Sequence, residues 1–180
     1  MQQHSHGPLA TGGDMPGQQR KRKKRLRIYL AGGLFNSAER VRNMMLAEAL
    51  EELGYVVILP QVAALNRFSN GRFDIAGVVV DCTQASTDPK NITVACLDGA
   101  DADSGMAVEF GMALTATGRA IGYRTDFRTA LEQEVGINAM FRGKGAIIIY
   151  HPCFITTQRE MRQFYRELAQ EIDAAIQTAT

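Results

Sequence analysis

Short apolar runs alternate with longer amphipathic segments along most of this chain. Each short run is rich in β-branched or aromatic residues and stops at a glycine, proline or polar residue, which is typical of a buried strand. The expected strands are 27–32, 55–60, 92–97, 120–124 and 147–152. The expected helices, whose apolar positions recur at helical spacing, are 37–54, around 73–86, 104–118 and 159–179. Strands that alternate with helices predict an α/β fold, with a parallel five-stranded sheet flanked by helices.

The size and composition fit one globular domain. The chain has 180 residues, of which 46% are hydrophobic and 22% are charged. No apolar run approaches the roughly 20 residues that cross a bilayer, so no membrane association is expected. Residues 1–19 are polar and lack the apolar core of a secretory signal, so a cytoplasmic location is expected. The cysteines, an odd number, are expected to be free thiols: Cys82, Cys96 and Cys153.

The charge is unevenly distributed. The run RKRKKRLR at 20–27 holds seven of the 20 basic residues, whereas residues 28–180 hold 13 bases and 18 acids. An acidic domain binds nucleic acid poorly, so no nucleic-acid partner is expected. The basic run could be a nuclear address, an electrostatic arm or simply a solvated segment. We expect residues 1–25 to be a disordered basic leader and residues 26–180 to form the domain.

The most informative segment is the acidic loop before the helix at 104–118. It places Asp98, Asp101, Asp103 and Glu109 within a dozen residues, just after the strand at 92–97. Open α/β sheets bind ligands at the carboxyl ends of their strands. A carboxylate inside an apolar helix is costly to desolvate unless it has a task or a partner. The segment therefore predicts an enzyme that works with carboxylates, with Asp98 among the substrate-binding groups.

Two of these acids have distinct alternatives. Asp103 could cap the helix or handle a proton. Glu109 could be a snorkelling edge residue, the partner of an arginine or a nucleophile. Carboxylates crowded together push their proton affinities apart, so one stays ionised while another shares or donates a proton. This is the arrangement of enzymes that cleave glycosidic bonds through an oxocarbenium-like transition state.

The first strand and its turn supply further candidates. Tyr29 could pack in the core or orient a carboxylate through its hydroxyl. In the turn after the strand, Gly32 and Gly33 allow a ligand to approach the backbone, with Phe35 beside them, although a purely structural turn is the alternative. The pattern AGGLFN is neither GxGxxG nor a P-loop, which argues against a dinucleotide or NTP site. Scattered histidines and the absence of CxxC argue against a zinc site, and no cofactor is expected.

Three motifs taken in order resemble the nucleoside 2-deoxyribosyltransferases: IYLAGGLFN-AER, LDG-ADADSG-MAVEFG and GYRTDFR. The resemblance covers roughly residues 27–150. It implies a flavodoxin-like (Rossmann-like) fold and transfer of 2-deoxyribose between nucleobases through a covalent glycosyl-enzyme ester. The implied partners are a 2′-deoxynucleoside and a free nucleobase, and the implied role is nucleotide salvage.

The resemblance also implies roles for single residues. Glu109 falls on the nucleophile, Asp103 on the loop aspartate six residues before it, and Tyr29 on the tyrosine of the first strand. Asp81 falls on a second, base-handling aspartate and Gln61 on a glutamine after the second strand. Asn138, in an INAM segment, falls on an asparagine supplied by a neighbouring subunit, which implies a homo-oligomer with shared active sites.

Two alternatives remain beside the transferase. The chain departs from many members at Met106, where they have a small residue in the DSG segment. A related group of nucleotide N-hydrolases binds a 5′-phosphate, but GLFNSAER lacks the glycine-serine-arginine cradle and the acidic loop would repel a phosphate. A transferase is therefore favoured over a deoxynucleoside or deoxynucleotide hydrolase, and over a non-catalytic nucleotide-sensing module, because Glu109 is intact.

Overall fold

The computed structural model describes residues 27–128 and 136–179, so the leader expected at 1–25 lies outside the described residues. The strands are β1 (Arg27–Ala31), β2 (Val56–Ile58), β3 (Phe68–Ser69), β4 (Arg72–Phe73), β5 (Asn91–Cys96), β6 (Ala120–Arg124) and β7 (Ala146–Tyr150). The helices are α1 (Ser37–Glu52), α2 (Pro60–Asn66), α3 (Ile75–Thr87), α4 (Ser104–Thr117), the 3₁₀ helix η1 (Ala139–Arg142) and α5 (Gln158–Ala179).

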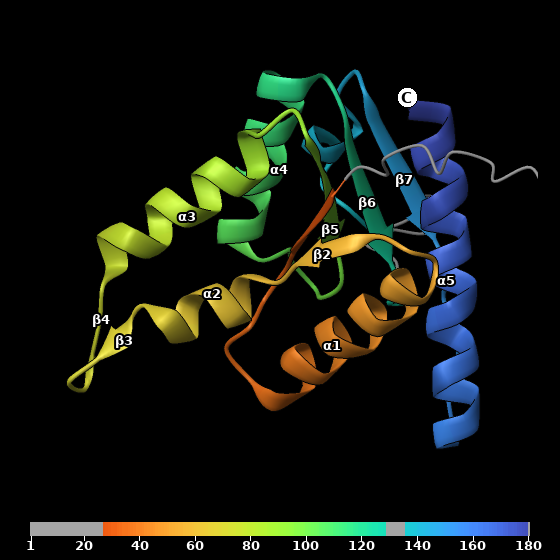
Figure 1. The fold of residues 1–180 in the computed structure, drawn as a ribbon. Helices are drawn as coiled ribbons and strands as arrows, with labels where there is room; N and C mark the ends of the chain where they lie inside the picture. The colour runs from red at the N-terminus through yellow and green to blue at the C-terminus, as the bar shows by residue number, and fades with distance from the viewer. Residues whose placement is uncertain (1–26, 129–135, 180) are drawn as a thin grey trace, which may run out of the picture.

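The main sheet has five parallel strands in the order β2-β1-β5-β6-β7 (Figure 1), which confirms the predicted α/β architecture. The chain runs from β1 to its outer neighbour β2 and then crosses back to β5, on the other side of β1. The connections that follow β1 and β5 therefore lead toward opposite edges of the sheet, and the two strands lie side by side. In flavodoxin-like sheets this switch point, at the carboxyl ends of the strands, is where ligands bind. The fold therefore directs attention to the loops after β1 and β5.

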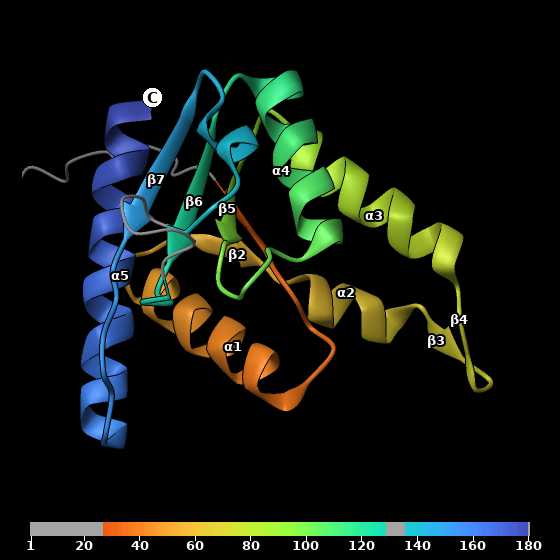
Figure 2. The same cartoon turned by 180° about the vertical axis from the view of Figure 1, so that it is seen from behind.

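Helices cover both faces of the sheet, and α1 and α5 pack on one of them (Figure 2). Alternate strand residues such as Ile28 and Ile92 point to that side, where they meet Leu46 and Leu168. The opposite face packs against α4, with α3 lying alongside it. Tyr29 faces this second side because it follows Ile28 in the strand, and so β1 delivers its phenol to the α3–α4 layer.

The pattern did not predict α2, the β3–β4 hairpin or η1. Pro60 ends β2 early by taking the first position of α2, where its missing N–H costs nothing. Asn70 and Gly71 make the two-residue hairpin turn with φ of 52° and 74°, the left-handed backbone that such turns require. The predicted helix around 73–86 is α3, which starts after Asp74 because the Asp74 carboxylate accepts a hydrogen bond from the Gly77 amide at 2.9 Å.

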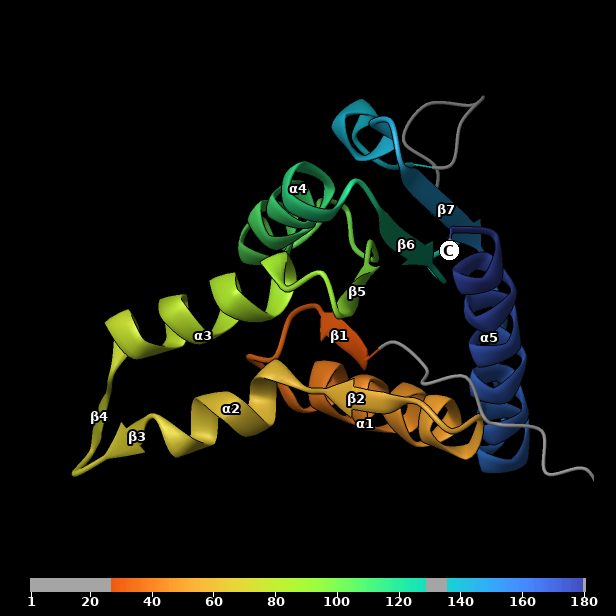
Figure 3. The same ribbon diagram turned by 45° about the horizontal axis from the view of Figure 1, so that its top comes forward.

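The segment from α2 through the hairpin to α3 projects away from the sheet (Figure 3). Seven large apolar side chains of this segment are exposed, and we call them the apolar arm: Val62, Leu65, Phe68, Phe73, Ile75, Val79 and Val80. Within residues 27–128 and 136–179, no helix is both long enough and apolar enough to cross a membrane.

Candidate active site

Tyr29 stands in the middle of β1, on the sheet face that α4 covers. Its side chain is only 1% exposed and belongs to a cluster with Met106 and Phe110 of α4. Burial raises the pKa of Tyr29, and the negative charge of Glu109 raises it further, so the phenol stays protonated. The hydroxyl makes no hydrogen bond of normal geometry to any described residue, although Glu109 and Cys82 lie near enough to shift its pKa. It is therefore a buried donor available to the carboxylate or to a ligand.

Glu109 lies on the second turn of α4, which begins at Asp103. The Asp103 carboxylate caps the helix by accepting a hydrogen bond from the Met106 amide at 2.8 Å, the capping role that the sequence allowed. Glu109 is half-buried at the edge of the Tyr29 cluster. Burial raises the pKa of Glu109, and the charge of Asp103 adds to this rise, whereas the Tyr29 hydroxyl and the Cys82 thiol lower it. Glu109 is therefore within electrostatic reach of both Tyr29 and Asp103, and the catalytic roles predicted for these three residues stay predictions.

The side chain that α3 brings to Glu109 is Cys82, which sequence reasoning took as an ordinary free thiol. Cys82 is half-buried and interacts with both Glu109 and Tyr29. Asp81, the predicted base-handling residue, instead forms a two-point ion pair with Arg67, at 2.8 Å to Nε and 2.7 Å to Nη2. Neighbouring residues of a helix point about 100° apart around its axis, so Asp81 and Cys82 lie on different faces of α3. This helical spacing is the only sequence signal that separates the two positions.

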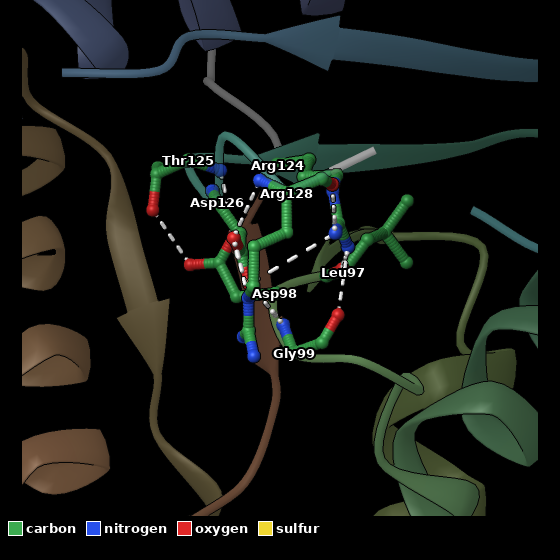
Figure 4. Close-up of polar contacts among 7 residues, drawn as sticks. All are labelled: Leu97, Asp98, Gly99, Arg124, Thr125, Asp126 and Arg128. Atoms are coloured by element: carbon green, nitrogen blue, oxygen red, sulfur yellow. Dashed lines mark hydrogen bonds and ion pairs between the residues drawn. The ribbon is translucent and has the colours of Figure 1, made fainter. Parts of the chain in front are cut away.

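Asp98 links the loop after β5 to the loop after β6 through hydrogen bonds (Figure 4). Its carboxylate accepts hydrogen bonds from the Thr125 amide and hydroxyl, both at 2.6 Å, and from the Asp126 amide at 2.9 Å. The buried Arg124 guanidinium donates to the carbonyl oxygens of Leu97 at 2.6 Å and Gly99 at 3.1 Å. These bonds hold the acidic loop in place, so the geometry gives Asp98 a bracing role and leaves its predicted substrate contact as a prediction.

A second bond set completes this junction. The Asp126 carboxylate accepts a hydrogen bond from the Gly99 amide at 3.2 Å and pairs with Arg128. Its hydrogen bonds with Arg128 hold the pKa of Asp126 well below its usual range. Gly99 has φ +113°, and a Cβ there would lie 2.8 Å from the Asp101 carbonyl oxygen, so only glycine fits this turn. The acidic loop is thus a pre-formed structure.

The turn after β1 is built around the first residues of α1. Glu39 accepts hydrogen bonds from the Phe35 amide at 2.7 Å and the Asn36 amide at 3.2 Å, and it completes a capping box with Asn36. A Cβ on Gly33 would lie 2.8 Å from the Glu39 carboxyl carbon, so a larger residue there would displace the carboxylate that completes the capping box. The Phe35 ring is 77% exposed and open to a ligand.

Gln61 is buried and braces α1 against α2. Its side-chain oxygen accepts a hydrogen bond from Asn43 at 3.1 Å, and Asn43 also donates to the Gly33 carbonyl oxygen at 3.0 Å. The chain Gln61–Asn43–Gly33 therefore ties the turn after β1 to α2. This position supports the turn, and direct substrate contact by Gln61, Gly32 or Gly33 stays a prediction.

Asn138 lies on the other side of β5 from Tyr29. It caps η1 by accepting a hydrogen bond from the Met140 amide at 3.0 Å. It also lines a cavity of about 220 Å³ with Leu97, Asp101 and Arg124. Because β1 and β6 flank β5 on opposite sides, one chain places Glu109 toward β1 and Asn138 toward β6.

Metal binding finds little support in the described part of the chain. No three His, Cys, Asp or Glu side chains of residues 27–128 and 136–179 are grouped as ligands of one ion. The chemistry on offer is instead a half-buried carboxylate, a protonated phenol and a second carboxylate at a helix start. A carboxylate in this setting can attack an electrophilic carbon while the second acid serves a leaving group.

The chain is similar to known proteins in sequence and in fold. A family model described as nucleoside 2-deoxyribosyltransferase matches residues 28–144. Among solved structures, a conserved protein of Enterococcus faecalis V583 aligns with a TM-score of 0.58 and 21% identity, over 80% of this chain and 99% of its own. A 2-desoxiribosyltransferase from Leishmania mexicana aligns with a TM-score of 0.51 and 15% identity, over 79% of this chain and 97% of its own. The search of curated proteins found no match.

Proposed function

The chain belongs to the nucleoside 2-deoxyribosyltransferase family, and from this premise we propose that it exchanges the base of a 2′-deoxynucleoside for another free nucleobase. The observation that carries the proposal is the half-buried carboxylate of Glu109, on the second turn of α4, beside the buried phenol of Tyr29. The fold places both groups on the α3–α4 side of the sheet, next to the switch point between β1 and β5.

The proposed reaction has two displacements. In the first, a Glu109 oxygen forms a bond to C1′ as the C1′–N bond breaks and its electron pair goes to the departing base. Asp103 passes a proton to that base. In the second, a nitrogen of the incoming base attacks C1′, Glu109 leaves as carboxylate, and the proton of the incoming base returns to Asp103. Two inversions at C1′ give net retention of configuration.

Tyr29 supports this reaction as a positioning group. Its hydroxyl is a protonated donor with no other partner of normal geometry among the described residues. A hydrogen bond from it to one Glu109 oxygen would fix the carboxylate plane and leave the other oxygen for C1′. The phenol would also stabilise the carboxylate when it leaves in the second step.

We also propose that the enzyme works as a homo-oligomer with shared active sites. The apolar arm exposes seven large side chains, and exposed patches of several hundred Å² mark interaction sites in soluble proteins. Asn138 lines a cavity with Arg124 of β6, whereas Glu109 interacts with Tyr29 of β1, on the other side of β5. Both features support an assembly in which Asn138 of one subunit approaches the site of another.

The decisive experiment mixes 2′-deoxyinosine with adenine and separates the products by chromatography. Deoxyadenosine plus hypoxanthine is the expected result. Hypoxanthine with free deoxyribose would show that water replaces the second base, which is the hydrolase alternative. Binding without turnover, measured on the same sample, would indicate a sensing module. The Glu109→Ala variant serves as the control for any background exchange.

A further inference from the structure

Cys82 lies on α3, which packs against α4, and its thiol is near enough to the Glu109 carboxylate for each to shift the pKa of the other. We propose that Cys82 is a positioning residue for Glu109 and that its thiol lines the deoxynucleoside site, the place that the sequence pattern gave to Asp81. This inference rests on the proposed function for the identity of the ligand. The proposed proximity of the thiol and the carboxylate does not depend on it.

The packing of α3 determines which side chain reaches the site. Ala85, three residues after Cys82 and on the same helix face, packs against the cluster that holds Tyr29 and Phe110. Cys82 is half-buried on this face. Asp81, about 100° around the helix, is held on another face by both guanidinium bonds of Arg67. Turning Asp81 toward Glu109 would break this ion pair.

A second observation supports a ligand site at the same spot. The Tyr29 hydroxyl is buried, and no described residue gives it a hydrogen bond of normal geometry. A buried polar group without a partner is costly, so such groups in native proteins usually await a ligand or an ordered water. Tyr29, Cys82 and Glu109 interact with one another, and they converge from β1, α3 and α4.

The chemistry of a thiol suits this position. Burial raises the pKa of the Cys82 thiol, so it is protonated at neutral pH and can donate to Glu109. That donation lowers the pKa of Glu109 and favours the ionised nucleophile. A neutral sulfur also adds no charge beside the carboxylate, whereas an aspartate there would repel it.

Alkylation of the thiols by iodoacetamide, followed by peptide mass spectrometry, tests the placement. The sulfur displaces iodide and the thiol proton passes to solvent. Cys153 is exposed and serves as a reference in the same molecule, while the buried Cys96 should stay unmodified. In Glu109→Gln the thiol loses a neighbouring negative charge, so Cys82 should react at least threefold faster at pH 8 than in the wild type. An unchanged rate for Cys82, relative to Cys153, would overturn the contact with Glu109.

The same assay tests the ligand. Saturating 2′-deoxyinosine, added to Glu109→Gln so that no turnover occurs, should slow Cys82 alkylation at least tenfold and leave Cys153 unaffected. Binding is followed in parallel by thermal shift. Binding without protection would overturn the inference and leave the proposed function standing. If no nucleoside binds, the proposed function fails, and the inference that the thiol lines the nucleoside site fails with it. The comparison of alkylation rates between Glu109→Gln and the wild type still tests whether the thiol lies beside the carboxylate.

Kinetics separate positioning from packing. Cys82→Ala should lower kcat about tenfold at nearly constant KM and move the acidic limb of the pH profile to higher pH. Cys82→Ser keeps a hydrogen-bond donor, so its kcat should lie within about threefold of the wild-type value. The acidic limb of its pH profile should lie at the wild-type position. Cys153→Ser is the matched control and should turn over normally. Equal losses in the alanine and serine variants, with an unmoved limb, would reduce Cys82 to a packing residue.

Discussion

Asp103 raises the pKa of Glu109, which follows it by six residues on the same helix. Burial of Glu109 is the larger cause of the rise, and the like charge of Asp103 adds to it because it disfavours the ionised form. Asp103 also caps α4 through the Met106 amide. The capping function and the electrostatic function of Asp103 can be separated by one substitution.

Asp103→Asn keeps a side-chain oxygen for the cap but removes the charge and the acid. We expect a nearly unchanged melting temperature, because asparagine caps helices as well as aspartate does. Loss of proton transfer should lower kcat by about 10²-fold or more. The acidic limb of the kcat/KM profile should move to lower pH, since the pKa of Glu109 falls when its neighbour is neutral. If activity instead decreases only as far as the melting temperature does, Asp103 is a cap and nothing more.

Glu109→Gln should be more stable than the wild type near neutral pH. An acid whose pKa is higher in the folded state contributes stability while it is protonated, and that contribution is lost as the pH rises through the unfolded and then the folded pKa. Above the folded pKa the wild type has lost it, whereas glutamine never ionises. Melting temperatures are measured for both proteins from pH 4 to pH 8. The variant should melt above the wild type at the high end of this range, and the difference should shrink toward the low end. A gap of constant size would mean that the variant acts through packing.

Glu109→Ala should abolish base exchange. Removing the nucleophile of a covalent route is expected to cost a factor of about 10⁴ or more in kcat. With the wild type, a slow 2-fluoro-deoxynucleoside should leave a sugar adduct on Glu109 that intact-mass analysis and peptide mapping locate. An adduct on another residue, or near-normal turnover by the alanine variant, would refute the assignment.

The sugar preference should favour deoxyribose. The candidate site combines carboxylates with apolar side chains such as Phe110, and the family implies 2′-deoxy substrates. A ribose 2′-hydroxyl buried there without a good partner would cost about 1–3 kcal/mol, so 2′-deoxyinosine should outpace inosine at least tenfold in kcat/KM. Initial rates with adenine as the common acceptor give the comparison. Equal rates would favour a general nucleoside hydrolase.

Assembly can be tested by complementation. Light scattering at micromolar concentration should give a mass of at least two chains, most simply a twofold pair. Glu109→Ala and Asn138→Ala, each inactive alone, should regain part of the activity when mixed, because exchange creates some sites with both residues intact. Ile75→Lys places a charge on the apolar arm and should weaken the assembly. A fully active monomer, or no recovery after demonstrated exchange, would exclude the shared site.

The sequence predicted the sheet because its strands are locally encoded, and the spacing of Asp103 and Glu109 is a local feature as well. The β5 run is buried throughout, and Asp103 and Glu109 lie on one continuous helix, so their separation is fixed by helix geometry alone. The family motifs fall on these same elements. The predicted strand at 55–60 was too long because Pro60 already belongs to α2.

The remaining site geometry depends on packing that one sequence does not reveal. Whether Asp81 or Cys82 reaches Glu109 is decided by the rotation of α3 and by a partner, Arg67, that lies 14 residues away from Asp81. The engagement of Asp98 by Thr125 joins residues 27 positions apart. The Asn70-Gly71 turn, by contrast, carried a recognisable hairpin signal that the helical pattern around it obscured.

Under the proposed assembly, the exposed side chains of the apolar arm have a consequence for the chain before it meets a second copy. Side chains such as Ile75, which is 73% exposed, can adhere to other unfolded or unassembled chains for as long as they remain uncovered. A newly synthesised subunit would therefore depend on how soon it meets a second one. The rate of synthesis, and not catalysis alone, would then set how much working enzyme a cell obtains.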